Sequence, residues 1–365
     1  MLRGIFMAGC LVAAGPVLAE TWPAADWQSQ PTAETPAAQA LDDYAFPLRD
    51  DVTRKGVRTD ALLVIKDGVI VHERYAAPTS AQSAHLTWSM SKSLFASVLG
   101  VAYGEGRFKL DDAVAQHYAP FAAHPDVKMG HLLNWASGLD WQEDYEYAPL
   151  KSSVVAMLYT RGRGDMAAFT ATHGLGAVPG TRFRYSSGDS NVLGASLKSM
   201  LGEQAYADYP WTALFEPLGI RSAVWERDAS GTFVASSYAY MTARDLARVG
   251  LLMQRGGRWG ERQLLPQSWV AFNRTPFANY QPDPAEPRRA VPGGQWWLNT
   301  VVEGMPLPWP DAPDDSFAAL GHWGQALYVM PSRQLVVVRY ADDRDKSFND
   351  NELLKRVLAA YGEQP

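Results

Sequence analysis

The sequence predicts an α+β fold with a mainly antiparallel sheet. Strand-like runs occur near both ends of the chain, at 61–75 and 326–340, whereas the middle, from 106 to 228, has helical and loop-rich patterns. Each strand-like region contains a turn signal, Asp67-Gly68 in the first and Pro331-Ser332 in the second. Strands joined by such short turns pair antiparallel. We therefore expect one sheet built from both ends of the chain, flanked by helices, with an inserted helical lobe.

Local patterns support the individual elements in chain order. Two apolar runs surround the Asp67-Gly68 turn, and the second extends to about residue 75. The apolar stretch after position 89 predicts a helix that ends near Gly104. The segment 242–254 places its large apolar side chains on one helical face. The remaining expected helices cover 111–118, 128–136, 150–160, 190–203 and 349–361, a further strand covers 295–302, and the proline-containing 278–294 is a surface loop.

Composition limits the classes of partner. Of the 365 residues, 47% are hydrophobic and 20% are charged, which is ordinary for a folded chain. The net charge of -6 argues against nucleic acid or an anionic membrane surface as a partner. We expect a small-molecule substrate, no nucleic acid and no membrane span, and the oligomeric state is not predicted.

The N-terminus has the pattern of a secretory signal peptide. Arg3 supplies the positive end, 5–14 is apolar, and cleavage is expected after Ala19. A lipoprotein signal ending at Cys10 is a less favoured alternative, because the apolar region before Cys10 is short. Cys10 is the only cysteine, so we expect the mature chain to lack disulfides and thiolate metal sites. The expected location is the periplasm.

These patterns divide the chain into three segments. The signal peptide covers 1–19, and a loosely ordered lead-in rich in alanine, proline and threonine covers 20–45. The folded domain covers 46–362. Within it, we expect a sheet lobe from 46–105 plus 229–362 and a helical lobe from 106–228.

The first candidate site residues are Ser89 and Lys92. Residues three apart on a helix share a face, so this spacing places the lysine amine against the serine hydroxyl. A serine hydroxyl becomes a good nucleophile only when a base takes its proton. A buried lysine can be that base, because burial disfavours the ammonium form. The first helical turn also favours negative charge that develops at the serine.

Two distant segments carry further candidates. Tyr185 lies in a loop just before a helix, where a phenol near a lysine can relay protons. His322 lies between Gly321 and Gly324 at the start of a strand. Glycines at a strand edge allow a backbone N–H to approach a ligand closely, as in an oxyanion hole. The imidazole could orient substrate or share in proton transfer.

The three segments, in this order, resemble the S-x-x-K, Y-x-N/S and K/H-x-G motifs of the serine β-lactamase and penicillin-binding protein superfamily. The closest resemblance is to its class C-like branch, and within that to 6-aminohexanoate-dimer hydrolases and related esterases. The resemblance covers about residues 45–362 and includes connecting segments such as 131–145 and 241–250. It implies the β-lactamase/DD-peptidase-like fold.

The resemblance also implies roles for individual residues. Ser89 is the acylated nucleophile, Lys92 is its base and Tyr185 relays protons. Substrate binding falls to four residues that match the second and third motifs: Ser187, His322, Gly324 and Gln325. The oxyanion hole would be formed by the backbone N–H groups of Ser89 and Gln325. No metal or organic cofactor is required.

Two departures from the β-lactamase pattern favour esters or simple amides as substrates. Ser187 replaces the asparagine that many members have, and His322 replaces a lysine. A largely neutral imidazole is a weak anchor for the carboxylate of a β-lactam. A β-lactamase or DD-peptidase is the alternative enzyme. A non-catalytic sensor domain is the alternative of another class, and fold alone cannot separate it from an enzyme.

Overall fold

The computed structural model describes residues 20–146, 148–283 and 289–362. The predicted signal peptide, 1–19, lies outside the described residues. Among the described residues, no helix combines the length and the apolar character that crossing a bilayer requires.

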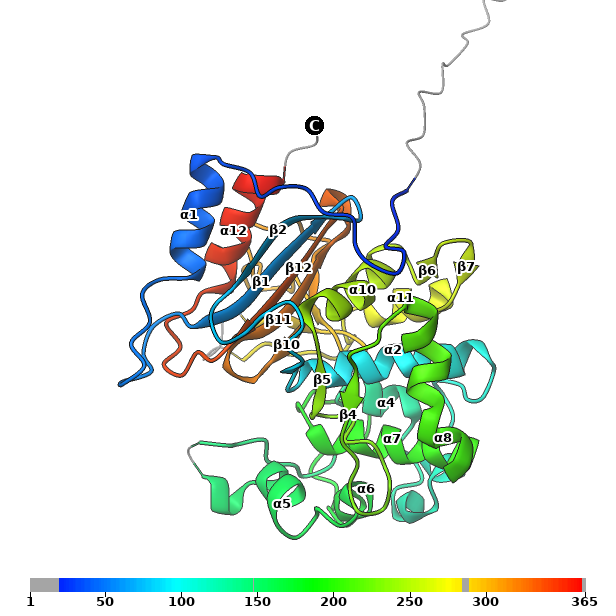
Figure 1. The fold of residues 1–365 in the computed structure, drawn as a ribbon. Helices are drawn as coiled ribbons and strands as arrows, with labels where there is room; N and C mark the ends of the chain where they lie inside the picture. The colour runs from blue at the N-terminus through cyan, green and yellow to red at the C-terminus, as the bar shows by residue number, and fades with distance from the viewer. Residues whose placement is uncertain (1–19, 147, 284–288, 363–365) are drawn as a thin grey trace, which may run out of the picture.

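A seven-stranded antiparallel sheet, ordered β2-β1-β12-β11-β10-β9-β8, forms one half of the molecule (Figure 1). The strands are β1 (Thr59–Lys66), β2 (Val69–Tyr75), β8 (Val291–Pro292), β9 (Trp297–Leu298), β10 (Phe317–Gly321), β11 (Gln325–Met330) and β12 (Leu335–Ala341). Asp67 and Gly68 both have positive φ, as the tight hairpin between β1 and β2 requires. The strands come from both ends of the chain, so the predicted α+β architecture is confirmed.

Both faces of the sheet are buried. Leu62 and Val64 of β1 face a core shared with α1 (Pro36–Ala45) and α12 (Asp350–Tyr361), which lie side by side on one face (Figure 1). Leu63 and Ile65 point to the opposite face, where α10 (Ala243–Gln254) and α2 (Met90–Gly104) pack. Successive side chains of a strand alternate between faces, so a continuous apolar run such as 61–65 indicates a sheet covered on both sides.

The helical lobe lies on the side of α2 that faces away from the seven-stranded sheet (Figure 1). Its helices include α3 (Val114–His117), α4 (Met129–Leu133), α5 (Ser153–Tyr159), α6 (Met166–Ala171), α7 (Ser187–Leu201), α8 (Glu203–Pro210) and α9 (Glu216–Leu218). A small sheet of β3 (His85–Leu86), β5 (Ala239–Met241) and β4 (Val224–Trp225) lies at its border. The remaining elements are β6 (Arg258–Trp259), β7 (Arg262–Gln263) and α11 (Gln267–Asn273). Helix α2 is buried along most of its length, so the chemistry it carries lies between the two lobes.

The prediction of a loosely ordered lead-in over 20–45 is wrong. Thr35 caps α1, which begins at Pro36 and packs against α12. Trp27 is buried, and its indole N–H donates to Arg244 O. The alanine-rich composition masked an amphipathic helix whose apolar side includes Leu41, which is fully buried. The first strand of the sheet therefore begins after a segment that is itself part of the fold.

Other predicted elements differ in length. The helices expected at 111–118 and 128–136 are the shorter α3 and α4, and the expected strand at 295–302 is only β9. Strand β10 was not predicted, because 317–321 is short and flanked by loop-like sequence. This omission matters, because the end of β10 forms one wall of the candidate site.

Candidate active site

Ser89 lies at the N-terminal end of α2, and the segment before it is held firmly. The backbone N–H and the hydroxyl of Thr87 both donate to Ala239 O of β5, each at 2.9 Å. Trp88 has a φ of +48°, a strained conformation for a bulky residue that the surroundings must impose. The serine therefore sits in the predicted place, at a helix start where the helix dipole favours negative charge.

The Lys92 amine contacts Ser89 directly. Its Nζ lies 3.1 Å from Ser89 Oγ, 3.0 Å from Ser187 Oγ and 3.1 Å from the backbone oxygen of Ser236. The residue is only 1% exposed. Three oxygens therefore surround a buried amine, and one of them belongs to the predicted nucleophile.

The ring of Tyr185 lies close to the same amine. Lys92 Nζ is 4.7 Å from the centre of the tyrosine ring. The ring is packed against Trp135 and Trp297, with centroid separations of 5.0 Å and 5.5 Å. Ser186 then caps α7 by accepting a hydrogen bond from the Asp189 N–H. The structure thus brings together Ser89, Lys92 and Tyr185, which are up to 96 positions apart in the chain.

Ser187 does not face the substrate cavity as its predicted role requires. It is fully buried, and its hydroxyl lies between Lys92 Nζ at 3.0 Å and Glu143 Oε1 at 2.5 Å. Its backbone N–H donates to Glu143 Oε2 at 2.9 Å. As the second residue after Tyr185, at the first position of α7, it is directed inward and links the lysine to a carboxylate.

The end of β10 forms the wall opposite Tyr185. A side chain at Gly321 would place its Cβ 2.5 Å from Thr87 O, so only glycine allows this strand to approach the segment before Ser89. Leu320, Gly321 and His322 all line the same cavity as Ser89. Backbone donors near this strand end are therefore candidates for an oxyanion hole.

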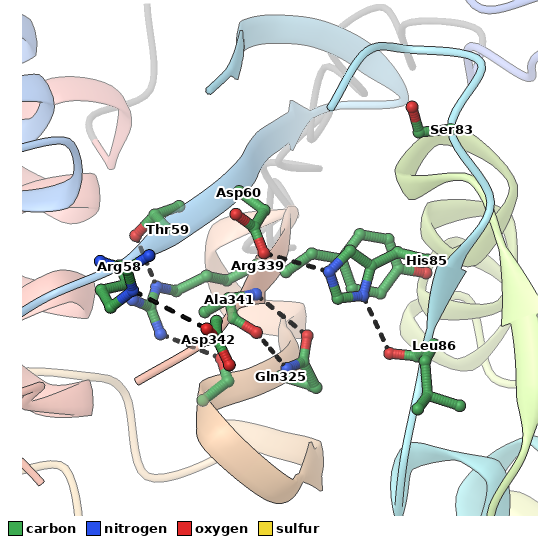
Figure 2. Close-up of polar contacts among 12 residues, drawn as sticks. Arg58, Thr59, Asp60, Ser83, His85, Leu86, Gln325, Arg339, Ala341 and Asp342 are labelled. Atoms are coloured by element: carbon green, nitrogen blue, oxygen red, sulfur yellow. Dashed lines mark hydrogen bonds and ion pairs between the residues drawn. The ribbon is translucent and has the colours of Figure 1, made fainter. Parts of the chain in front are cut away.

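Gly324 and Gln325 do not line this cavity. A Cβ at Gly324 would collide with the buried pair Arg339 and Asp343. The Gln325 side chain is 1% exposed and bonds both backbone groups of Ala341 (Figure 2). Because Gln325 pairs with Gly321 across the hairpin, the turn displaces it from the site. The structure therefore assigns both residues to the β10–β11 connection rather than to substrate binding.

His322 stands at the cavity edge, among aromatic rings. Its ring centre is 5.6 Å from that of Trp88 and 5.5 Å from that of Tyr145. Burial lowers the pKa of His322 below its ordinary value, although Glu146, 3.8 Å away, opposes this shift. The imidazole is therefore neutral at pH 7 and supplies no fixed positive charge.

The cavity in front of Ser89 has a volume of about 420 Å³. Its walls are mostly aromatic and aliphatic, with a few polar groups. The lining residues are Trp88, Ser89, Glu143, Tyr145, Tyr185, Arg289, Ala290, Trp297, Trp309, Leu320, Gly321, His322 and Asp350. This size and composition suit a small organic ligand.

Glu143 and Tyr145 were not among the predicted site residues, although the family resemblance included the segment 131–145 that contains them. They lie in an irregular part of that segment, and the fold carries them to the cavity. Burial raises the pKa of Tyr145 well above its ordinary value, so its phenol remains a hydrogen-bond donor at neutral pH. A short polar segment between two known motifs offers no periodicity that could have marked them.

A second serine, histidine and aspartate lie near one another, but they do not form a catalytic triad. His85 Nε2 lies 3.1 Å from Asp60 Oδ2, and its Nδ1 lies 3.0 Å from Leu86 O (Figure 2). Both ring nitrogens are therefore engaged, and Ser83 instead contacts Ser80. Without a free nitrogen, His85 cannot activate a hydroxyl.

No group of three or more histidine, cysteine, aspartate or glutamate side chains within 20–146, 148–283 and 289–362 could hold a metal ion. Among the described residues, the reactive groups in mutual contact at the cavity include Ser89, which contacts Lys92, and Lys92, which in turn contacts Ser187.

The helix-borne serine and lysine, with a tyrosine from a second segment, define a serine hydrolase of the β-lactamase type. The Beta-lactamase family model matches residues 41–361, and the chain belongs to that family. It is thus a hydrolase of the serine β-lactamase superfamily. The chain is 27% identical over 303 residues to the 6-aminohexanoate-dimer hydrolase of Paenarthrobacter ureafaciens, covering 77% of this chain and 72% of that protein.

Solved structures share the fold at low identity. A Bacillus anthracis protein provisionally named a 6-aminohexanoate-dimer hydrolase is 20% identical, with a TM-score of 0.71 over 92% of this chain and 86% of that one. EstCE1, a hydrolase with promiscuous acyltransferase activity, is 16% identical, with a TM-score of 0.68 over 89% and 98%. A D-stereospecific amidohydrolase from Streptomyces is 16% identical, with a TM-score of 0.62 over 88% and 98%. The resemblance inferred from the three motifs is confirmed.

Proposed function

We propose that the protein hydrolyses carboxylic esters or linear amides through an acyl-enzyme on Ser89. The observation that carries this proposal is the 3.1 Å contact between the buried Lys92 amine and Ser89 Oγ at the floor of an aromatic cavity. Relatives named as a 6-aminohexanoate-dimer hydrolase, a hydrolase with promiscuous acyltransferase activity and a D-stereospecific amidohydrolase support this proposal. We further propose that the chain acts in the periplasm after its signal is removed.

The reaction has two balanced stages. Ser89 Oγ bonds to the carbonyl carbon as its proton passes to Lys92 Nζ, and the C=O electron pair moves onto the oxygen. Backbone N–H groups of Ser89 and of the β10 end near His322 hold this oxyanion. The oxyanion then collapses, the bond between the carbonyl carbon and the leaving group breaks, and the proton moves, through Tyr185, to the leaving alcohol or amine. In the second stage water bonds to the acyl carbon as it gives a proton to the same groups, the bond to Ser89 Oγ breaks, and that proton returns to Ser89 as the carboxylic acid leaves.

The apolar walls beside Ser89 and the neutral His322 support a preference for uncharged acyl groups over β-lactams, while Glu143, Arg289 and Asp350 also line the cavity. Trp88, Trp297 and Leu320 offer apolar surface beside Ser89, and apolar walls bind apolar substrate parts. His322 stands near the oxyanion wall with its pKa lowered by burial, so it attracts a β-lactam carboxylate weakly. A β-lactamase or DD-peptidase is the second candidate, favoured by family membership.

A substrate panel tests this proposal. Purified protein should turn over p-nitrophenyl butyrate or a linear 6-aminohexanoate amide faster than nitrocefin or a D-Ala-D-Ala peptide. Ser89→Ala should abolish both turnover and labelling by a fluorophosphonate, because it removes the hydroxyl that lines the cavity and contacts the Lys92 amine. Ser83→Ala is the matched control and should keep full activity. Turnover of nitrocefin alone would reject the ester and amide preference, and labelling of Ser89→Ala would reject the nucleophile.

A further inference from the structure

Glu143 receives hydrogen bonds from three donors. Ser187 donates its hydroxyl to Oε1 at 2.5 Å and its backbone N–H to Oε2 at 2.9 Å, while the Trp141 indole N–H reaches Oε2 at 2.5 Å. A carboxylate can only accept hydrogen bonds, and the backbone and indole N–H groups can only donate. The direction of each hydrogen bond around Glu143 is therefore fixed.

This fixed direction continues to the lysine. Because the Ser187 hydroxyl proton points to Glu143, the side of its oxygen that faces Lys92 Nζ, 3.0 Å away, carries a lone pair. The backbone oxygen of Ser236, 3.1 Å from the same amine, also accepts only. In the neutral form that the proposed proton transfer from Ser89 requires, the amine has two N–H groups and one lone pair. Ser187 and Ser236 then accept hydrogen bonds from the two N–H groups, and the lone pair is left for Ser89.

We propose that Glu143 is a positioning residue which, through the Ser187 hydroxyl, holds the lone pair of Lys92 on Ser89. This inference rests on the proposed acyl-enzyme function and extends it to a residue outside the three motifs. Glu143 acts on the lysine through Ser187 rather than by taking the proton of Ser89. A substitution that reverses the serine hydroxyl would therefore disable the base while leaving every heavy atom in place.

Glu143→Gln makes that reversal. The two N–H donors at Oε2 require an oxygen there, so the glutamine carbonyl must take that position. Its NH₂ group then faces Ser187 Oγ and donates to it. The Ser187 proton must then turn away from Glu143, toward Lys92 or Tyr145, and where it turns to Lys92 it occupies the lone pair that Ser89 needs. We expect kcat/KM for p-nitrophenyl butyrate to fall roughly 100-fold, within the range for loss of a general base.

A double-mutant cycle with Ser187→Ala separates this mechanism from a structural role. Without the Ser187 hydroxyl nothing remains to be reversed, so Glu143→Gln in the Ser187→Ala background should change kcat/KM by less than about 3-fold, since the two residues act as one unit. An equal loss in both backgrounds would show that Glu143 acts by folding or by charge alone. The proposal would also be overturned if Glu143→Gln did not lower kcat/KM in the protein that retains Ser187.

Glu143→Asp is the conservative variant and keeps the inference testable if Glu143→Gln misfolds. It retains an acceptor-only group and should keep more activity than Glu143→Gln or, where that variant does not fold, more than Glu143→Ala. The opposite order would overturn the proposal. Fluorophosphonate labelling of the unsubstituted protein is measured beside the cycle. Absence of labelling there would reject the acyl-enzyme itself, whereas a labelled enzyme with a flat cycle rejects only the role of Glu143.

Discussion

The two interiors of this molecule are built from different side chains. In the sheet, Leu63, Val64 and Val337 are completely buried and surrounded by apolar groups. Between α2 and α7 the buried side chains include Ser93 and Ser190, each of which donates a hydrogen bond to Gln295. Apolar packing is non-directional, whereas hydrogen bonds fix positions and directions. The sheet therefore stabilises the fold, and the polar seam between α2 and α7 sets the geometry of the site.

Gln295 shows how the seam is held. Its backbone oxygen accepts from Ser93 of α2 at 2.6 Å, and its side-chain oxygen accepts from Ser190 of α7 at 2.7 Å. Its amide group donates to the backbone oxygens of Leu132 and Leu133 in α4. One buried amide thus connects the helix of Ser89 and Lys92 with the helix that follows Tyr185.

Backbone strain is also found beside the site. Positive φ values occur at Trp88, Trp135, Gln295 and Trp323, all of which lie in segments that form or support the cavity. Such conformations cost of order 1–3 kcal/mol each and persist only where the surroundings impose them. Within the described residues of β1, β2 and β10 to β12 no residue has this conformation, whereas the turns that join these strands have it at Asp67 and Gln334. In the sheet the strained positions are therefore confined to the turns, whereas near the site they lie in segments that form or support the cavity.

The largest effect should come from Lys92→Met in the polar seam. The substitution removes the base that contacts Ser89, so kcat/KM should fall about 10³-fold or more. The thermal unfolding midpoint should change far less, because the replacement has a similar length and stays buried. Lys198→Met is the matched control, since Lys198 bonds Ser230 far from the cavity lining, and it should keep its activity. An active Lys92→Met enzyme would contradict the proposed base.

The converse effect should come from Leu63→Ala in the sheet. The leucine is fully buried, so its truncation should lower the free energy of unfolding by about 2–5 kcal/mol. The kcat of the folded fraction should stay within 2-fold of the unsubstituted enzyme, because β1 does not line the cavity. Urea unfolding and ester turnover below the transition measure the two quantities. Leu48→Ala serves as the control, since Leu48 is fully exposed. A large loss of kcat in Leu63→Ala would show that the sheet interior also sets the geometry of the site, contrary to the proposed difference between the two interiors.

The same distinction explains what the sequence could predict. The sheet, α2 and α10 were predictable because continuous apolar runs and helical periodicity report burial directly. The contact of Ser89 with Lys92 was predictable because both lie on one helix, three residues apart. The contact of Lys92 with Tyr185 followed from resemblance, since no local rule joins positions 92 and 185.

The remaining misses have a common physical cause. Glu143 reaches the site from an irregular segment, and its importance lies in the direction of hydrogen bonds that only three-dimensional contacts define. Gln325 was misplaced because a motif match does not show where a strand ends and its turn begins. Gly321, at the true end of β10, is the glycine that packs against Thr87 O. The lead-in was misjudged because composition alone does not report the packing of α1 on α12.

The smallest expected effect is a pH dependence of folding stability that arises in the polar seam. Asp189 of α7 is fully buried, and burial raises its pKa to about 7, although hydrogen bonds from Ser137 and Ser186 oppose this. The unfolded carboxyl titrates near pH 4, so between about pH 4 and 7 the folded chain holds a proton that the unfolded chain has lost. A raised carboxyl pKa therefore contributes stability at low pH that is lost as the pH rises to about 7.

Asp189→Asn should remove this dependence, because an amide carries no charge at any of these pH values. Relative to the unsubstituted protein, the variant should gain at most about 1.4 kcal/mol per pH unit between pH 5 and 7, and the difference should be constant above pH 8. Urea unfolding of both proteins at pH 5, 6, 7 and 8 measures it, with Asp126→Asn, at an exposed position, as the control. If the difference in unfolding free energy between the two proteins is the same from pH 5 to 8, the fold does not raise the pKa of Asp189. The polar interior would then be no more costly to charge than the surface, and the contrast with the apolar sheet would rest on geometry alone.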